Sequence, residues 1–423
     1  KKVSWISDLK LRGGWGIMGN QLNLTVNNGY FLYGGDRNAT YYDLAGVNNG
    51  LDAGFAGKQI GNPGAKWESD INANIGIDAA LFNGEFDFSA DYYRKDIKDL
   101  LYDPELPGLA GTSAQPFVNI ARMKNEGFDF SLGWHKSISK NLQLNVTGTL
   151  TTYKNKIVTI ADGVAYFDSD GRRFDGSNII RNAVGQPVSS FFGYKIIGFW
   201  NEDAELTEAD QLAQKATNTP DAIYQEGEGL GRFRYQDVNG DGIITPDDRT
   251  FLGNPNPDFS YGINLGVTYK GFDFSIFLFG VQGNQIWNNV RWWRDFYPSF
   301  ESAKSKTALY DSWRPDHHNA TAPIQEVDGS TSTQNVPNSY MVENGAYLRA
   351  KNVQLGYTIP ANMLTRIHVE KLRIYVQAAN LFTITKYSGL DPEIGGSNIT
   401  DFGVDEGAYP NQRQFLVGVN LGF

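Results

Sequence analysis

The feature that most constrains this chain is a strict two-residue alternation of apolar with polar or small residues. The last twelve residues, QRQFLVGVNLGF, show it most clearly. One face of that segment carries Phe415, Val417, Val419, Leu421 and Phe423. SYGINLGVTYKG (260–271) and LQLNVTGTLTTY (142–153) repeat the pattern. Successive side chains of a β-strand point to opposite faces, so this period predicts strands with one apolar face.

Seven further segments share this period and extend the prediction along the chain. They lie near 8–18, 69–81, 86–97, 126–135, 272–281, 346–359 and 371–383. Together they give about ten strands of about 10–14 residues each, whereas an ordinary strand has about five or six. A tilted strand of about ten residues spans the hydrocarbon core of a bilayer.

The chemistry of the two faces indicates which side meets lipid. The apolar face often ends in aromatic residues, such as Tyr261 and Tyr269, as expected for the girdles at the two membrane interfaces. The opposite face carries Lys10, Arg12, Asp87, Asp91, Asp129 and His135. A basic residue facing lipid at mid-bilayer would cost roughly 2–4 kcal/mol, so these residues are expected to face a lumen. A soluble β-sandwich shows the same alternation in the reverse sense, and strand length and loop pattern favour the barrel over it.

The connections between the predicted strands alternate between short and long. The short ones are FNGE (82–85), SISKN (137–141), Lys270-Gly271 and PANMLTRIHVE (360–370). The long ones are about 19–68, 98–125, 154–257, 282–345 and 384–411. Short turns on one side and long loops on the other are typical of outer-membrane barrels. We therefore predict an all-β, antiparallel transmembrane barrel wall, with 154–257 as a large extracellular loop insertion.

Composition removes several classes of function. Acidic residues outnumber basic ones by 47 to 37, which argues against a general nucleic-acid binder, because such proteins neutralise phosphates with Lys and Arg. The chain has no cysteine, which excludes a thiol nucleophile, a cysteine-ligated zinc site and a disulfide framework. The chain contains no run of 18 apolar residues, so we predict no membrane-spanning helix. The segment KKVSWISDLKLRGG at the start does not have the apolar stretch of a signal peptide. Four scattered histidines support no catalytic arrangement, so we predict no catalytic residues and no enzyme.

The segment DVNGDGIITPDD (237–248) matches the calcium loop of an EF-hand. Such loops use side-chain oxygens at positions 1, 3 and 5, a glycine at 6, a backbone carbonyl at 7 and an acid at 12. The predicted ligands are Asp237, Asn239, Asp241, Ile243 through its carbonyl, and Asp248. FRYQ precedes the loop and Pro246 interrupts it, so no helix flanks it as a sensor would require. We expect a structural calcium site; a metal-free Asn/Asp/Gly turn is the alternative.

A second loop, NQIWNNVRWWRDFYPSF (284–300), is rich in aromatic and basic residues. Aromatic faces stack on sugars and apolar side chains, and arginine binds carboxylates. The candidate contacts for a substrate or a partner are Trp287, Arg291, Trp292, Trp293, Phe296 and Tyr297. The alternative is that these residues pack the loop against itself.

Several segments resemble the SusC/RagA-like TonB-dependent transporters of Bacteroidetes outer membranes. The longest is DVNGDGIITPDDRTFLGNPNPDFSYGINLGVTYKGFDFSIFLFGVQGNQIWN (237–288). The others are LKLRGGWGIMGNQ (9–21), YLRAKNVQLGYTIP (347–360), KLRIYVQAANLFTITKYSGLDPEIGG (371–396) and YPNQRQFLVGVNLGF (409–423). The resemblance covers essentially the whole chain.

This resemblance implies a 22-stranded barrel of the outer membrane, with an N-terminal plug in its lumen. Residues 1–423 would be the C-terminal portion, closing against strands supplied elsewhere in the same protein. The expected partners are a SusD-like surface lipoprotein and, through the N-terminal part, TonB–ExbB–ExbD. The implied function is active import of an oligosaccharide or oligopeptide. A passive porin or surface adhesin on a similar barrel, and a secreted calcium-binding β protein, are the alternatives.

Overall fold

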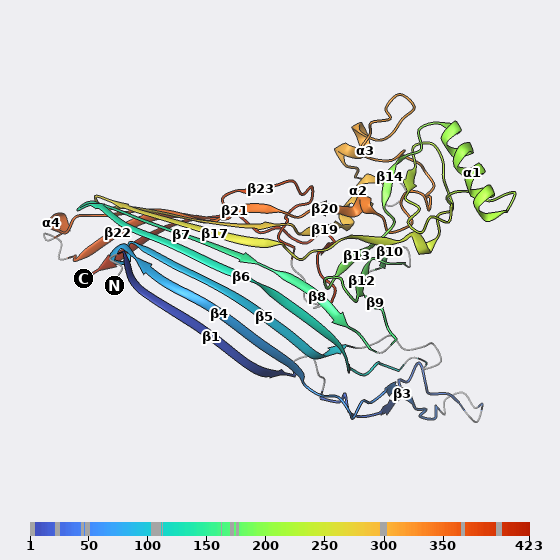
Figure 1. The fold of residues 1–423 in the computed structure, drawn as a ribbon, viewed down its shortest axis with the longest axis horizontal. Coiled ribbons are helices and arrows are strands. Elements are labelled where there is room, and N and C mark those ends of the chain that lie inside the picture. The colour runs from blue at the N-terminus through green and yellow to red at the C-terminus, as the bar shows by residue number, and fades with distance from the viewer. Residues whose placement is uncertain are drawn as a thin grey trace.

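The computed structural model contains a long, twisted antiparallel sheet with a compact assembly of loops at one end (Figure 1). Both chain termini and helix α4 (Ala361–Leu364) lie at the opposite end of the sheet (Figure 1). The structure describes residues 5–21, 26–43, 46, 51–102, 111, 113–161, 163–169, 173–174, 177–296, 303–364, 369–394 and 400–423.

The main sheet, which we call the wall, has 12 strands, and most of them follow one another in sequence order. The continuous path is β1 (Ile6–Asn20), β4 (Glu68–Leu81), β5 (Phe86–Tyr102), β6 (Val118–Ser139), β7 (Leu142–Thr152), β17 (Phe259–Tyr269), β18 (Phe272–Gln282), β21 (Tyr347–Thr358), β22 (Lys371–Ala379) and β25 (Gln414–Gly422). Two short strands complete the sheet: β8 (Lys154–Thr159) pairs with β6, and β23 (Thr383–Thr385) pairs with β21. The predicted set of about ten long antiparallel strands is therefore confirmed, with β1 and β25 at the two edges.

Tight turns set the register between neighbouring strands at the short-turn end. Lys270 and Gly271 both adopt positive φ (47° and 88°), so two residues suffice to reverse the chain between β17 and β18. Asn83 and Gly84 do the same inside the short 3-10 helix η1 (Phe82–Gly84), which joins β4 to β5. The predicted turns at these two places are confirmed.

Some predicted boundaries were wrong. The predicted strand 371–383 breaks after Ala379, because Asn380 adopts a left-handed φ of 51° and the following strand β23 pairs with a different part of β21. The predicted loop 98–125 is shorter than expected, since β5 runs on to Tyr102 and β6 begins at Val118. Polar residues end the two-residue apolar pattern there, while the backbone pairing continues. Among the described residues, no helix has the length and apolar character needed to cross a membrane.

Three of the predicted long loops fold together at the long-loop end. We call this assembly the loop domain; it comprises the described residues of 160–257, 282–346 and 384–411. Its core contains Ile179, Ile180, Phe191, Tyr194, Phe233, Tyr235, Trp287, Phe296, Ala322, Tyr340, Met341 and Val404. These residues come from all three loops, so the loop domain has one shared hydrophobic core.

Short elements build the loop domain around this core. Its strands are β9 (Tyr166–Asp168), β10 (Arg173–Phe174), β11 (Ser177–Asn178), β12 (Ile180–Ala183), β13 (Ser190–Gly193), β14 (Ile196–Phe199), β15 (Phe233–Tyr235), β16 (Thr250–Gly253), β19 (Gln285–Asn288), β20 (Val342–Asn344) and β24 (Val404–Asp405). Its helices are α1 (Asp203–Thr217), η3 (Pro246–Asp248), α2 (Asn289–Asp295), α3 (Lys306–Tyr310) and η5 (Ser339–Met341). A separate hairpin of β2 (Leu32–Gly34) and β3 (Ala56–Gln59) lies in the first long loop.

Candidate functional site

The outward, apolar face of the wall has a sharply bounded apolar band. On β5 the outward positions are Phe86, Phe88, Ala90 and Tyr92, and on β6 they are Phe128, Phe130, Leu132 and Trp134. Lys136 and Glu85 form an ion pair of 2.5 Å just below this band, and Arg94 and Glu126 stand directly opposite each other just above it. Eight residues separate Phe86 from Arg94, about 26 Å along the strand, which suits a tilted strand crossing a hydrocarbon core.

Aromatic rings mark both borders of the band. At the lower border Trp5, Phe82, Phe86 and Trp134 form a chain of neighbouring rings, with centroids 5.9–6.3 Å apart. At the upper border the rings of Tyr92 and Phe128 lie 5.2 Å apart. Amphipathic rings favour the boundary between hydrocarbon and headgroups, so these two rows locate the interfaces of a bilayer.

The polar face of the wall carries charged pairs that span neighbouring strands. Arg12 on β1 binds Asp78 on β4 at 2.6 Å and reaches over β4 to Asp91 on β5 at 2.8 Å. The strand register places Gly76 between Arg12 and Asp91. A Cβ at Gly76 would lie 2.1 Å from the Asp91 carboxylate, so glycine is needed for this contact. Arg12 and Asp91, two of the residues predicted to face a lumen, are therefore paired with each other.

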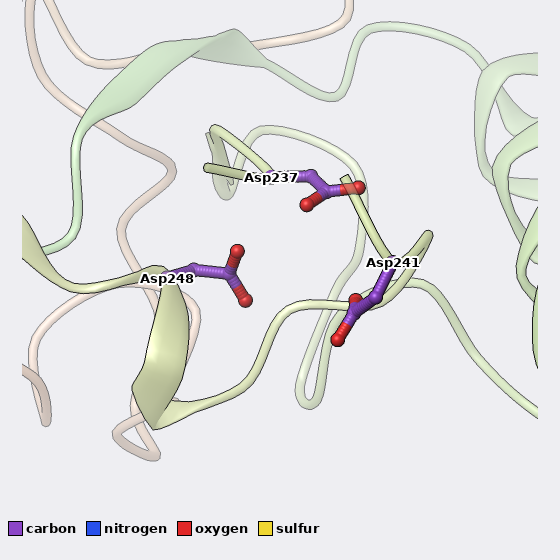
Figure 2. Close-up of side chains that lie close together, drawn as sticks. All are labelled: Asp237, Asp241 and Asp248. Carbon is purple, nitrogen blue, oxygen red and sulfur yellow. The ribbon is translucent and has the colours of Figure 1, made fainter. Parts of the chain in front are cut away.

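A separate candidate site is the acidic loop 237–248 in the loop domain. One carboxylate oxygen from each of Asp237, Asp241 and Asp248 lies within 4.8 Å of the others. Figure 2 shows the three side chains approaching a common region from different parts of the loop. Asp248 is fully buried, whereas Asp241 is exposed. The structure thus brings together the three acids that the sequence predicted as ligands.

Backbone geometry explains why this segment closes into a loop. Gly240 and Gly242 adopt positive φ (78° and 88°), and a Cβ at Gly242 would lie 2.6 Å from the Cβ of Ala216 in α1. Ile244, two residues after Gly242, donates its N–H to the carbonyl of Tyr224 at 2.7 Å. The loop follows β15 and ends in the short η3, which agrees with the prediction that no EF-type helices flank it.

Hydrogen bonds from the backbone orient the carboxylates of the loop. Asp237 accepts the N–H groups of Gly240 and Gly242 at 2.6 and 2.9 Å. Asp248 accepts those of Val238 and Thr245, both at 2.8 Å. The predicted ligand Asn239 donates its side-chain amide to Asp241 at 3.0 Å and accepts the N–H of Asp241 at 2.8 Å.

The residues of the loop fit a hard divalent cation such as calcium. Each carboxylate oxygen has more than one lone pair, so the backbone hydrogen bonds leave acceptor capacity for an ion. No ion pair with a basic side chain joins these three acids within the part of the chain that the structure describes. Oxygen donors of this kind are the ligands that calcium prefers. The predicted carbonyl ligand, Ile243, follows Gly242 and donates its own N–H to Asp241 at 3.1 Å.

The aromatic loop divides into buried and exposed members. Trp287 and Phe296 belong to the loop-domain core, with exposed fractions of 0% and 3%, and so offer no surface to a ligand. Trp292 is partly buried and donates its indole N–H to the carbonyl of Gln334 at 3.0 Å. Trp293 is 45% exposed. The remaining candidate, Tyr297, lies outside the described residues.

Arg291, the basic candidate, is held by groups of the protein itself. Its guanidinium stacks 3.6 Å from the centre of the Tyr340 ring and lies 3.2 Å from Asp295 and 3.7 Å from Glu343. Burial acts to lower the pKa of Arg291, but Tyr340, Glu343 and Asp295 outweigh it, so the pKa is raised. The arginine joins α2 to η5 and β20.

A further structural cluster was not predicted. Arg349, only 2% exposed, binds Asp391 and Glu393, and Lys351 also binds Glu393 at 2.6 Å. This cluster fastens the last long loop to β21. The sequence does place two basic residues, Arg349 and Lys351, two positions apart on one strand. Their acidic partners lie about 40 residues later, so no local pattern identifies the pairing.

A wall of long amphipathic strands, apolar outside and polar inside, defines a transmembrane β-barrel protein. Residues 3–381 match the TonB dependent receptor-like β-barrel family, and the chain belongs to that family. Proteins of this family are integral to the outer membrane and are transport receptors, not enzymes. The predicted SusC/RagA-like identity is confirmed.

The known proteins that are similar to this chain are considerably longer than it. TonB-dependent receptor P26 of Formosa agariphila is 32% identical over 98% of this chain and 40% of its own length. TonB-dependent receptor SusC of Bacteroides thetaiotaomicron is 27% identical over 100% of this chain and 38% of its own. A solved structure of the RagAB peptide transporter superposes on this chain with a TM-score of 0.77 and 22% sequence identity. The match covers 100% of this chain and 42% of the transporter chain. The chain thus spans about 40% of the length of the curated relatives.

Proposed function

We propose that this chain forms part of an outer-membrane importer that takes up an oligosaccharide or an oligopeptide with energy from TonB. The observation that carries the proposal is the wall itself: an outward apolar band bounded by aromatic rows, with charged pairs on the lumen side. Membership of the TonB-dependent receptor family supports active import over passive diffusion. One solved structural neighbour is named a peptide transporter, which supports a substrate of oligomer size.

In this proposal the lumen holds a plug from the N-terminal part of the whole protein, and the loop domain meets a SusD-like surface lipoprotein. The loop domain has a single core drawn from three loops, so it is rigid enough to present a defined surface to such a lid. The exposed Trp293 is the member of the aromatic loop best placed to contact a lid or a substrate.

Growth tests separate active import from its alternatives. A strain lacking the gene should lose growth on one class of oligomer, either glycan or peptide, and keep growth on the corresponding monomer. Deletion of TonB should abolish the same growth, because the plug would no longer be displaced. Uptake that persists without TonB would identify a passive porin, and normal growth on every oligomer would favour an adhesin. Copurification of a surface lipoprotein with the complete protein would test the lid.

We also propose that the loop 237–248 binds calcium and acts as a strut for the loop domain. The support is the convergence of Asp237, Asp241 and Asp248 within 4.8 Å around a glycine-dependent turn that packs against α1. Without flanking helices to reorient, a bound ion would hold the loop in place permanently.

Replacement of Asp237 and Asp241 by Asn tests the strut against an ordinary turn. Asparagine removes the negative charge but also replaces one of the two oxygens with which Asp237 accepts backbone N–H groups, so the chelator treatment of wild type decides between the ion site and an ordinary turn. The calcium proposal predicts that the double variant, and wild type treated with a chelator, are both cleaved faster by protease within 154–257. Asp221→Asn, an exposed acid of the same loop, serves as the matched control. Equal cleavage of wild type with and without calcium would overturn the proposal.

A further inference from the structure

The outward face of the wall changes character just above its upper aromatic row. On β6 the outward positions continue from Phe128 through Glu126 to Lys124. The short strand β8 extends this surface, because Lys154 pairs directly with Glu126, and Lys156 with Lys124. Residues directly opposite each other in an antiparallel pair point to the same face, so the three lysines share the outward face.

Burial along β8 supports this orientation. Lys154 and Lys156 are exposed, whereas Asn155 and Ile157, which alternate with them, are buried. Asn155 donates its side-chain amide to Asn125 of β6 at 2.6 Å and accepts the N–H of Val188 at 2.7 Å. The inward face of β8 is therefore fixed to the loop domain, and its lysines lie on the opposite face of the strand.

The counterions of this surface are unevenly distributed. Lys124 binds Glu126 at 2.6 Å, and the Tyr92 hydroxyl donates to the same carboxylate at 3.0 Å. Within the described ranges, neither Lys154 nor Lys156 forms an ion pair. Among the described residues, these two ammonium groups thus have no bonded counterion, in a chain whose overall charge is −10.

These lysines border a cavity of about 430 Å³, large enough for a headgroup. Lys124, Lys154 and Lys156 line it together with Asn254 and Asn256 of the loop domain. Two acids, Glu126 and Asp258, also line it, which leaves an excess of one positive charge. Lys124 lies four residues beyond Phe128, about 13 Å along the strand and roughly 10 Å higher for a strand tilted by about 40°. That height corresponds to the headgroup layer of the outer leaflet.

We propose that this cavity binds the phosphate of an outer-leaflet glycolipid, with the acyl chains of the lipid lying on the aromatic row below. Lysine binds phosphate as a compact positive charge, and basic groups at the membrane surface attract anionic headgroups. The aromatic row of Tyr92 and Phe128 supplies an adjoining surface for the hydrocarbon. The inference concerns the lipid-facing side of the wall and does not depend on the imported substrate.

Binding of phosphorylated lipid A to the complete protein in mixed micelles tests this inference. The variant K154Q/K156Q removes the two unpaired charges, and K195Q/K215Q removes two exposed lysines of the loop domain as a matched control. Each basic group near an anionic surface contributes about a fivefold gain in affinity, so K154Q/K156Q should bind about 25-fold more weakly. The control should bind as wild type does. Heat-modifiable mobility in gels reports folding, and K156Q alone provides a milder variant with about a fivefold loss.

Three results would overturn the inference. The first is unchanged affinity in folded K154Q/K156Q. The second is equal binding of lipid A from which the phosphate has been removed, because the lysines would then not recognise that group. The third is binding of inorganic phosphate alone with similar affinity, which would identify a site for free anions. Saturable binding of phosphorylated lipid A that millimolar phosphate does not displace is the expected result.

Discussion

The wall and the loop domain place the same kinds of residue on opposite sides. In the wall, Trp15 is 71% exposed and Leu11 is 77% exposed, both on the outward face. In the loop domain, Trp200 and Trp287 are fully buried. The loop domain follows the rule of a water-soluble protein, with its apolar groups inside. The wall follows the rule of a membrane barrel, in which lipid covers the apolar groups.

The two regions also differ in how far apart in sequence their contacts lie. In the wall, every second pair of neighbouring strands is joined by a short turn, which sets the register of that pair. In the loop domain, Trp287 pairs with Val404, and the Asn182 amide donates to the carbonyl of Thr400. The wall brings the ends of the 154–257 loop together, since Tyr153 donates its N–H to Asp258 at 3.1 Å. Holding the loop ends together lowers the entropy cost of forming the loop domain's contacts between residues far apart in sequence. We therefore expect the loop domain to form after the wall.

The strongest test of the comparison is a cavity in the loop domain. Trp287→Ala removes a fully buried ring and should lower the free energy of unfolding of the loop domain by about 3–5 kcal/mol. Limited proteolysis should then cut the loop domain while the wall stays heat-modifiable. Trp293→Ala, at a 45% exposed ring, is the control and should change stability by less than about 1 kcal/mol. Simultaneous loss of wall and loop domain would show that the two are not separate units of stability.

A basic residue on the lipid face provides the converse test. Leu132 lies near the middle of the outward band of β6, and Leu132→Arg should cost roughly 2–4 kcal/mol in a bilayer. The neighbouring Ser131 points to the lumen side, where Ser131→Arg should cost much less because water and carboxylates are available. Urea unfolding in lipid vesicles measures both variants. Equal costs for the two would contradict the assignment of faces.

The smallest expected effect is a pH dependence confined to the loop domain. Burial, and then the hydrogen bond and charge of Asp210, raise the pKa of Glu228 from 4.5 to about 8. Between these two values the folded state keeps a proton that the unfolded state has released, so the free energy of unfolding falls as the pH rises through that window. Tryptophan fluorescence should report a lower melting temperature for the loop domain at pH 9 than at pH 6.

Glu228→Gln provides the control for this pH effect. Glutamine is neutral at every pH, so the variant should flatten the pH dependence of the loop domain's melting temperature. The stability of the wall should depend on pH as it does in wild type. A pH dependence that survives the substitution would assign it to another group.

The wall was predictable because its signal is local. Each strand repeats an apolar residue at every second position, and only lipid on one side and a polar lumen on the other satisfy that pattern over such lengths. The acidic loop was predictable for a similar reason, since Asp237, Gly242 and Asp248 follow a fixed spacing within twelve residues. The sequence also carried a signal for helix α1, because DAELTEADQLAQKAT is rich in good helix formers. Its buried stripe consists only of Ala209 and Ala213, too weak to stand out.

The loop domain was decided by tertiary structure. Whether an aromatic residue in a long loop is buried depends on partners more than 100 residues away, such as Val404 for Trp287. Pattern within one segment cannot distinguish Trp287, which is enclosed, from Trp293, which is exposed, although six residues separate them. The sequence by itself therefore determined which surface of the strands meets lipid, because that follows from local alternation together with strand length and the pattern of loops. Only the tertiary structure decided which loop residues remain available to a partner, because that depends on how three distant loops fill one core.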